Sequence, residues 1–218
     1  MSTQTALNTC MVMANANLNR GYPKFAGGEA ARATWRKALR NEKTTLSRYN
    51  ELSGGVFAKA ADIVLDDSTK RKTTVQVDPV NKKLWDSVRE TIYLLVRDGK
   101  PMKIGGTRTG MKERFGSYKC GHCVPQRMDK NDKPYPGKMS VTNAHIYHTI
   151  EDDLLNGGKW EFWTWTLPTV EITVDIMGTP TKVIAQTYHA YESRCIELFK
   201  NENGSIPQLC DNADPNYR

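Results

Sequence analysis

The sequence of 218 residues lacks several features that would assign it to a membrane or to a secretory route. It has no apolar run of about 18 residues, so we expect no helix that spans a bilayer. Its first residues show no basic stretch followed by an apolar core, so we expect no secretion signal. Cysteine is scarce and dispersed, which fits free thiols in a reducing compartment better than a disulfide framework. These absences predict a cytoplasmic protein.

The sequence also lacks a complete zinc motif. Cys120-Gly121-His122-Cys123 places two cysteines three positions apart, a spacing that can hold a metal. No second CxxC or paired histidine follows, so a full zinc site would need distant ligands such as Cys195 or Cys210. A dithiol redox site and plain loop cysteines are the alternatives, because the motif lies in a polar, turn-rich stretch that predicts a long loop.

Positive charge is concentrated in the first part of the chain. Residues 1–85 contain 14 Lys and Arg against 7 Asp and Glu, whereas residues 86–218 contain 17 of each. A basic segment attached to a balanced domain predicts contact with a polyanion, and a solvated basic surface is the alternative. We therefore divide the chain into a basic DNA-contacting region, 1–85, and a second domain, 86–218.

The basic region has the pattern of a small helical cluster. Residues 29–41 are good helix formers with an apolar face around Trp35 and Leu39. Residues 45–52, capped by Thr44 or Thr45, and residues 56–65 predict two further helices. The remaining faces are basic, and the candidate DNA contacts there are Arg32, Arg36 and Arg40.

The most informative stretch is 91–118, which predicts a hairpin followed by a helix. Residues 92–96 are apolar and β-favouring, Asp98-Gly99 is a strong turn signal, and residues 102–104 resume the strand. Residues 111–118 suit a short helix. The hairpin would hold Tyr93 and Lys103 on adjacent strands, and the helix could bring Arg114 over them.

These residues resemble the GIY-YIG nuclease superfamily. Thr91-Ile92-Tyr93 corresponds to the first motif, with Thr where the family name has Gly. Lys103-Ile104-Gly105 corresponds to the second motif, and its Lys is similar to some restriction-enzyme members. Arg114 follows Lys103 by eleven residues. The resemblance implies a small, mostly antiparallel sheet flanked by helices, which makes the fold class α+β, with an N-terminal helical region added.

A late helix over residues 186–200 carries the second half of the resemblance. Glu192 lies one turn after Tyr188, next to the apolar stripe, whereas Glu197 lies on a different face. Family members carry a metal-binding Glu on a late helix, followed by Leu or Ile residues and a Pro…Asn tail. Glu192, Ile196, Pro207 and Asn212 resemble that arrangement, and a surface Glu is the alternative.

The resemblance assigns a role to each candidate residue. Glu192 would hold one Mg²⁺ or Mn²⁺ per site, which polarises phosphate. Arg114 would bind the non-bridging phosphate oxygens, and Tyr93 would orient or deprotonate the attacking water. Lys103 would assist as a base, and Tyr118 is a second-rank site residue on the face of Arg114. For Arg108 and Lys112 we expect contacts with the DNA backbone, with mere solubility as the alternative.

Three further elements complete the second domain. Residues 142–155 predict a helix that Gly157-Gly158 closes, and residues 160–167 predict an apolar inner strand of the sheet. The aromatic side chains of that strand would be buried, or would form a platform on which bases stack. Residues 169–175 and 181–185 predict a second hairpin around Gly178.

The sequence therefore predicts a metal-dependent endonuclease that hydrolyses phosphodiester bonds in double-stranded DNA, of the restriction type. A phage or mobile-element nuclease, a repair nuclease and a non-catalytic nucleic-acid-binding protein are the alternatives, and a zinc-loop interaction module is a further one. No membrane partner is expected, and the sequence leaves a homodimer open.

Overall fold

The computed structural model describes residues 39–66, 74–119 and 141–210. These residues form an α+β fold with a small antiparallel sheet, which confirms the predicted fold class. The helices and strands, in chain order, are α3 (Leu46–Leu52), β1 (Ala58–Asp66), β2 (Thr74–Pro79), α4 (Lys82–Trp85), β3 (Thr91–Arg97), β4 (Lys100–Thr107), α5 (Met111–Lys119), α6 (Val141–Leu155), β5 (Trp160–Thr166), β6 (Val170–Ile176), β7 (Thr179–Ala185) and α7 (Tyr188–Asn203).

Five strands form the main sheet, in the order β2-β1-β5-β3-β4. The central position of β5 confirms the prediction of an inner strand. Its residues Trp160, Phe162 and Thr164 are buried in alternation, as expected for a strand whose successive side chains face opposite sides. β4 is an edge strand and pairs with β3 in antiparallel register, with Asp98 and Gly99 in the turn between them.

The chain divides into two compact units that interleave along the sequence. The first, which we call the hairpin unit, contains residues 41–62, 79–111 and 161–218. The second, which we call the α6 unit, contains residues 1–40, 63–78 and 112–160. Residue 85 falls inside the hairpin unit, and the functional division of the chain at that point stays a prediction.

The core of the hairpin unit lies against β3, in which six consecutive residues, Thr91 to Val96, are buried. Ile92, Leu94 and Val96 pack in a cluster with Cys195 and Phe199 of α7. This run is apolar on both sides of the strand because both sides are covered.

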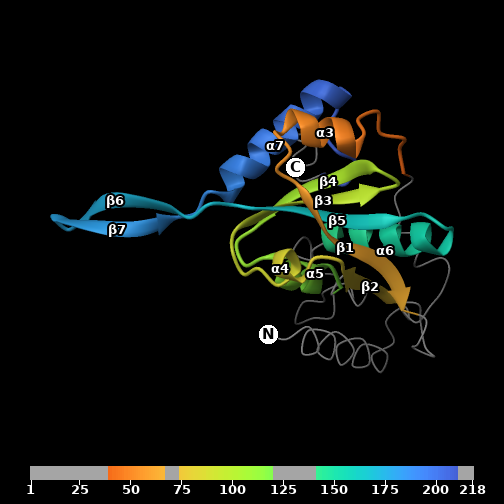
Figure 1. The fold of residues 1–218 in the computed structure, drawn as a ribbon, viewed down its shortest axis with the longest axis horizontal. Coiled ribbons are helices and arrows are strands. Elements are labelled where there is room, and N and C mark those ends of the chain that lie inside the picture. The colour runs from red at the N-terminus through yellow and green to blue at the C-terminus, as the bar shows by residue number, and fades with distance from the viewer. Residues whose placement is uncertain (1–38, 67–73, 120–140, 211–218) are drawn as a thin grey trace, which may run out of the picture. The chain divides into compact units, whose positions relative to one another are not determined.

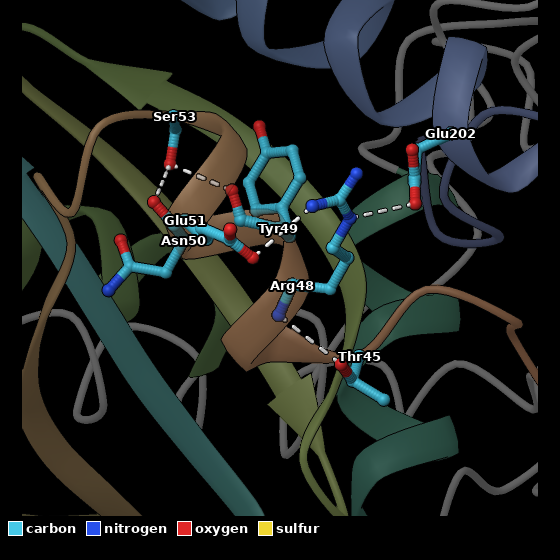
Figure 2. A network of polar contacts seen from close by, with 7 residues as sticks. All are labelled: Thr45, Arg48, Tyr49, Asn50, Glu51, Ser53 and Glu202. Carbon is cyan, nitrogen blue, oxygen red and sulfur yellow. Dashed lines mark hydrogen bonds and ion pairs between the residues drawn. The ribbon is translucent and has the colours of Figure 1, made fainter.

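Helix α3 is fastened to α7 in the same unit (Figure 2). Thr45 caps α3 by accepting a hydrogen bond from the backbone N–H of Arg48 at 3.3 Å, as predicted. The guanidinium of Arg48 lies 3.2 Å from Glu51 and 3.0 Å from Glu202 of α7. The buried hydroxyl of Tyr49 donates to the carbonyl of Cys195 at 2.8 Å. These contacts hold α7 against α3.

The α6 unit is organised by the buried side chains of α5 and α6. Tyr147 accepts a hydrogen bond from the backbone N–H of Val75 at 3.0 Å, and Asn143 donates to the carbonyl of Ser117 at 3.1 Å. Burial lowers the pKa of Lys119, an effect that Asp66 opposes, and the ammonium donates to Gln76. The predicted helices over 111–118 and 142–155 are confirmed.

One element was predicted wrongly, and others lie outside the described residues. Residues 56–65 were expected to form a helix, but residues 58–66 form strand β1. Ala60 and Ala61 are fully buried there, so packing in the sheet overrides the helix propensity of alanine. Most of the expected helix over 29–41 lies outside the described residues, and so does the whole Cys120–Cys123 loop. Among the described residues, no helix is long and apolar enough to cross a bilayer.

A second hairpin, β6–β7, extends away from the end of β5 and the start of α7 (Figure 1). Met177 and Gly178 form its turn, both with positive φ, which confirms the prediction of a hairpin around Gly178. Among the described elements, β6 and β7 make extensive contact only with each other.

Candidate active site

The β3–β4 hairpin places Tyr93 directly across from Gly105. A Cβ at position 105 would lie 2.3 Å from the Tyr93 hydroxyl oxygen, so only glycine leaves room for that phenol. Tyr93 is fully buried and its ring packs edge-on against Phe162, with centroids 6.3 Å apart. The hydroxyl is therefore fixed over the backbone of β4.

Lys103 lies two residues before Gly105 and pairs with Leu95, so it belongs to the same side of the strand as Tyr93. Its side chain is buried, with only 5% exposed. The ammonium donates a hydrogen bond to the backbone carbonyl of Leu209 at 3.0 Å. A buried cation is costly unless it has such a partner.

Residues 207–210 form a segment along the edge of β4, which we call the clasp. The backbone N–H of Leu209 donates to the carbonyl of Met102 at 2.8 Å. The thiol of Cys210 accepts from the N–H of Ile104 at 3.2 Å and donates to its carbonyl at 3.1 Å. The clasp thus satisfies backbone groups that an edge strand would otherwise leave unpaired.

Glu192 reaches β4 from helix α7. A Cβ at position 106 would lie 2.9 Å from Glu192 Oε2 and 2.6 Å from Tyr188 Cδ2. The half-buried carboxylate therefore lies against the strand at Gly106 and is not turned out into solvent. Gly105 and Gly106 are neighbours, so the Tyr93 hydroxyl and the Glu192 carboxylate approach one short glycine segment from its two sides.

The charges of Lys103 and Glu192 act in opposite directions on the pKa of the Cys210 thiol. Burial raises the pKa of Cys210, the ammonium of Lys103 opposes that rise, and the carboxylate of Glu192 adds to it. The thiol bonds to the backbone of Ile104, two residues before Gly106, and the preceding residue Leu209 binds Lys103 through its carbonyl.

Arg114 and Tyr118 form a pair on helix α5 in the α6 unit. The guanidinium carbon of Arg114 lies 4.7 Å from the centroid of the Tyr118 ring, and its Nη2 is 3.4 Å from the Tyr118 hydroxyl. The predicted sharing of one helix face is confirmed. That this pair joins Tyr93, Lys103 and Glu192 in one site stays a prediction.

The other candidates for DNA contact lie on the surface where they are described. Arg40, Arg108 and Lys112 are exposed, as a phosphate contact requires. Arg32 and Arg36 lie outside the described residues. Trp163 and Trp165 of β5 are half-buried and pack against the core of the hairpin unit, and the alternative of a platform for stacking bases stays a prediction.

Glu192 is the candidate metal ligand at the glycine segment. The described residues contain no group of three or more His, Cys, Asp or Glu side chains that could enclose a metal. The Tyr188 ring and the Glu192 carboxylate fill the space that a Cβ at Gly106 would need. A cation held there by one carboxylate would need waters or phosphate oxygens for its other ligands, which is how Mg²⁺ is usually bound.

Sequence analysis missed two contributors to this arrangement. The carbonyl of Leu209 binds Lys103, and Glu90 Oε2 accepts hydrogen bonds from the backbone N–H and the hydroxyl of Thr187, each at 3.0 Å. Glu90 thereby holds the start of α7 one turn before Glu192. Neither contact has a spacing signal in the sequence, because each joins residues about 100 positions apart.

No protein-family model matches the chain, and no curated protein matches it. Solved structures that are similar to it include two nucleases. Restriction endonuclease HPY188I in complex with product DNA has a TM-score of 0.42 and 18% identity, over 80% of this chain and 96% of that chain. A mutant of bacteriophage T4 EndoII has a TM-score of 0.45 and 16% identity, over 72% and 96%. Because these overlaps are loose, the proposal below rests on the residues of this chain.

Proposed function

We propose that the protein is a metal-dependent endonuclease of the restriction type, which hydrolyses phosphodiester bonds in double-stranded DNA in the cytoplasm. One observation carries the proposal. The Glu192 carboxylate lies against Gly106, and the Tyr93 hydroxyl occupies the space over the adjacent Gly105. The carboxylate can hold a divalent cation, and the phenol on the other side of the same segment can orient or deprotonate a water.

Glu192 is the proposed ligand of one Mg²⁺ or Mn²⁺ ion. A divalent cation bound there would polarise a phosphate oxygen and the leaving oxygen. The side chain is held in place because Tyr188, one turn earlier on α7, packs against the same glycine. Glu90 fixes the N-terminus of that helix through Thr187. The direction of the carboxylate is thus set by α7 as a whole.

Lys103 and Tyr93 act from the other side of the glycine segment. The Lys103 nitrogen is held in place by its hydrogen bond to the Leu209 carbonyl. The Tyr93 hydroxyl is immobilised by its packing, so it can orient a water for attack or accept its proton. Lys103, buried at the same strand, is the proposed assisting base.

Arg114 is the proposed clamp on the non-bridging phosphate oxygens. Its planar guanidinium offers two parallel donors, which match phosphate geometry. The ring and hydroxyl of Tyr118 hold that guanidinium, so Tyr118 is a positioning residue. Exposed Arg40, Arg108 and Lys112 would add backbone contacts, together with Arg32 and Arg36.

The test is cleavage of long mixed-sequence duplex DNA by purified protein with Mg²⁺, followed by sequencing of the ends. Glu192→Gln should lower the cleavage rate by at least about 10²-fold, since it removes the charge that holds the cation. Glu197→Gln is the matched control. Glu197 lies on the same helix, is exposed and pairs only with Arg194 among the described residues, at 2.6 Å. Removing the Glu197 charge in this variant should leave the cleavage rate unchanged.

Intact DNA at every Mg²⁺ and Mn²⁺ concentration would overturn the nuclease proposal. Salt-dependent DNA binding without any cleavage would then favour the non-catalytic binding protein. Discrete fragments with common ends would support a restriction-type enzyme, whereas a smear would contradict that part of the proposal. Equal losses in Glu192→Gln and Glu197→Gln would contradict the role of Glu192.

A further inference from the structure

The β6–β7 hairpin has two unlike faces. Cross-strand partners in an antiparallel pair point to the same side, so the register assigns every side chain to a face. One side, which we call the apolar face, carries no charge and no polar group other than two threonines. Its residues are Val170, Ile172, Val174, Ile176, Thr179, Thr181, Val183 and Ala185.

All three charges of the hairpin lie on its other face. Glu171, Asp175 and Lys182 occupy that side, together with Thr173, Pro180 and Ile184. On the apolar face, Ile172 and Ile176 are 43% and 48% exposed, and Met177 at the tip is fully exposed. Among the described residues, no other helix or strand makes extensive contact with the hairpin, although Val174 and Val183 of the apolar face are half-buried.

A ribbon of two strands with an uncovered apolar side is marginal in water by itself. This hairpin is nevertheless held firmly at its root. The backbone N–H of Leu167 donates to the carbonyl of Glu90 at 2.8 Å, before β6 begins. The backbone N–H of Thr187, after β7 ends, donates to the carboxylate of the same Glu90 at 3.0 Å. Both ends of the arm are therefore fixed at one residue, and the arm leaves the hairpin unit in a set direction.

We propose that the apolar face of β6–β7 is a docking surface for the same face of a second copy of this chain. In a two-fold symmetric contact both copies use the same patch, and residue i of one copy meets residue j of the other, so a uniformly apolar face complements itself. The charged residues stay on the outer sides of the paired hairpins. No like charges are therefore brought together when two copies meet.

The composition of the hairpin disfavours two other occupants. A ribbon that enters a DNA groove needs cations for the phosphates, but this hairpin has two acids and one Lys. A different protein partner would be selected by polar groups at set positions, and the apolar face offers none beyond the threonines. Pro180 lacks a backbone N–H, which disfavours strand addition along the edge of β7 and favours contact through the face.

The area of the face sets the expected strength of association. Strands of seven residues are about 23 Å long, so each copy offers a few hundred Å². That is at the small end of specific interfaces, where association is weak and transient. The dimer should therefore form and dissociate as protein concentration changes in the micromolar range.

The test is sedimentation of the full chain over a range of concentrations, without DNA or Mg²⁺. The wild-type protein should show a monomer–dimer equilibrium. Ile172→Glu should raise its dissociation constant by about tenfold or more, because it places two carboxylates in an apolar contact. The matched control is Ile184→Glu, the same change at a 70% exposed isoleucine of the opposite face, which should leave the constant within about twofold.

A wild-type protein that stays monomeric at all concentrations would overturn the proposal, as would equal effects of the two variants. A monomer whose hairpin amides exchange slowly with solvent would mean that another segment of the chain covers the face. Loss of DNA binding in Ile172→Glu without any change in mass would assign the face to nucleic acid. Circular dichroism of both variants checks that the fold is retained. Because no catalysis is measured, the result is independent of the proposed nuclease activity.

Discussion

The two β-hairpins of the hairpin unit are built alike and are used differently. Each has strands of seven or eight residues and a turn of two residues with positive φ: 46° and 74° at Asp98 and Gly99, and 53° and 81° at Met177 and Gly178. In β3 six consecutive residues are buried, whereas no residue of β6 is fully buried. The same local design thus serves as sheet core in one place and as a projecting arm in the other.

The difference lies in the side chains and not in the turns. β3 is buried on both sides, and α7 covers the side that carries Ile92, Leu94 and Val96. β6 and β7 have one apolar side and one polar side, which is the pattern of strands with one face packed and the other in solvent. Two of the candidate catalytic groups, Tyr93 and Lys103, lie on the buried hairpin, where packing fixes side-chain positions. The arm keeps its apolar side available for a partner.

The largest expected difference between the hairpins is in stability. Leu94→Ala should lower the free energy of unfolding by about 2–5 kcal/mol, because it leaves a cavity in a fully buried site. Ile172→Ala, on the arm, should cost less than about 1 kcal/mol, since its side chain is already 43% exposed. Urea denaturation of the two variants at low protein concentration measures both values. Similar losses would show that the arm belongs to the cooperative core.

A smaller effect is expected where the two hairpins are joined. Glu90 precedes β3 and holds Thr187 through two hydrogen bonds to a carboxylate oxygen. Glu90→Ala should cost about 1.5–3 kcal/mol and increase hydrogen exchange at the start of α7 and in the arm. Glu90→Gln retains an acceptor oxygen and should recover part of that loss. Unchanged exchange in the arm would contradict its attachment at Glu90.

The smallest effect is expected at the arm's turn. Met177 has a left-handed backbone conformation that disfavours residues other than Gly, Asn and Asp, whereas Asp98 suits its own turn. Met177→Asn should therefore stabilise the arm by about 1 kcal/mol or less. Slower exchange of the β6 and β7 amides, with little change in global unfolding, is the expected result. A destabilised arm would show that the exposed Met177 side chain contributes contacts of its own.

Much of this fold follows from local patterns in the sequence. Asp98-Gly99 predicted the first hairpin, Gly178 the second, and the aromatic run of β5 its central place in the sheet. The prediction of a helix over residues 56–65 was wrong because Ala60 and Ala61 favour a helix when no tertiary contacts are considered. Their burial between strands is a tertiary effect, so no local rule could give it.

Some contacts of the candidate site can also be predicted from the sequence, and others cannot. The neighbourhood of Tyr93 and Lys103 follows from hairpin register, and the shared face of Tyr188 and Glu192 follows from helix periodicity. The clasp and the contact from Glu90 to Thr187 could not be predicted. They depend on a backbone carbonyl, a thiol and a helix terminus that meet only after the chain has folded. Gly106 resembles any strand glycine until α7 is placed beside it.

The clasp also has a consequence for the timing of assembly during translation. A separation of 106 residues lies between Lys103 and the carbonyl that it binds. A nascent chain on the ribosome therefore exposes the edge of β4 long before residues 207–210 have been synthesised. Until then the edge is open to pairing with other chains, and Lys103 is without this acceptor. The same late step of folding therefore covers the edge of β4 and gives Lys103 its acceptor, because Leu209 makes both contacts.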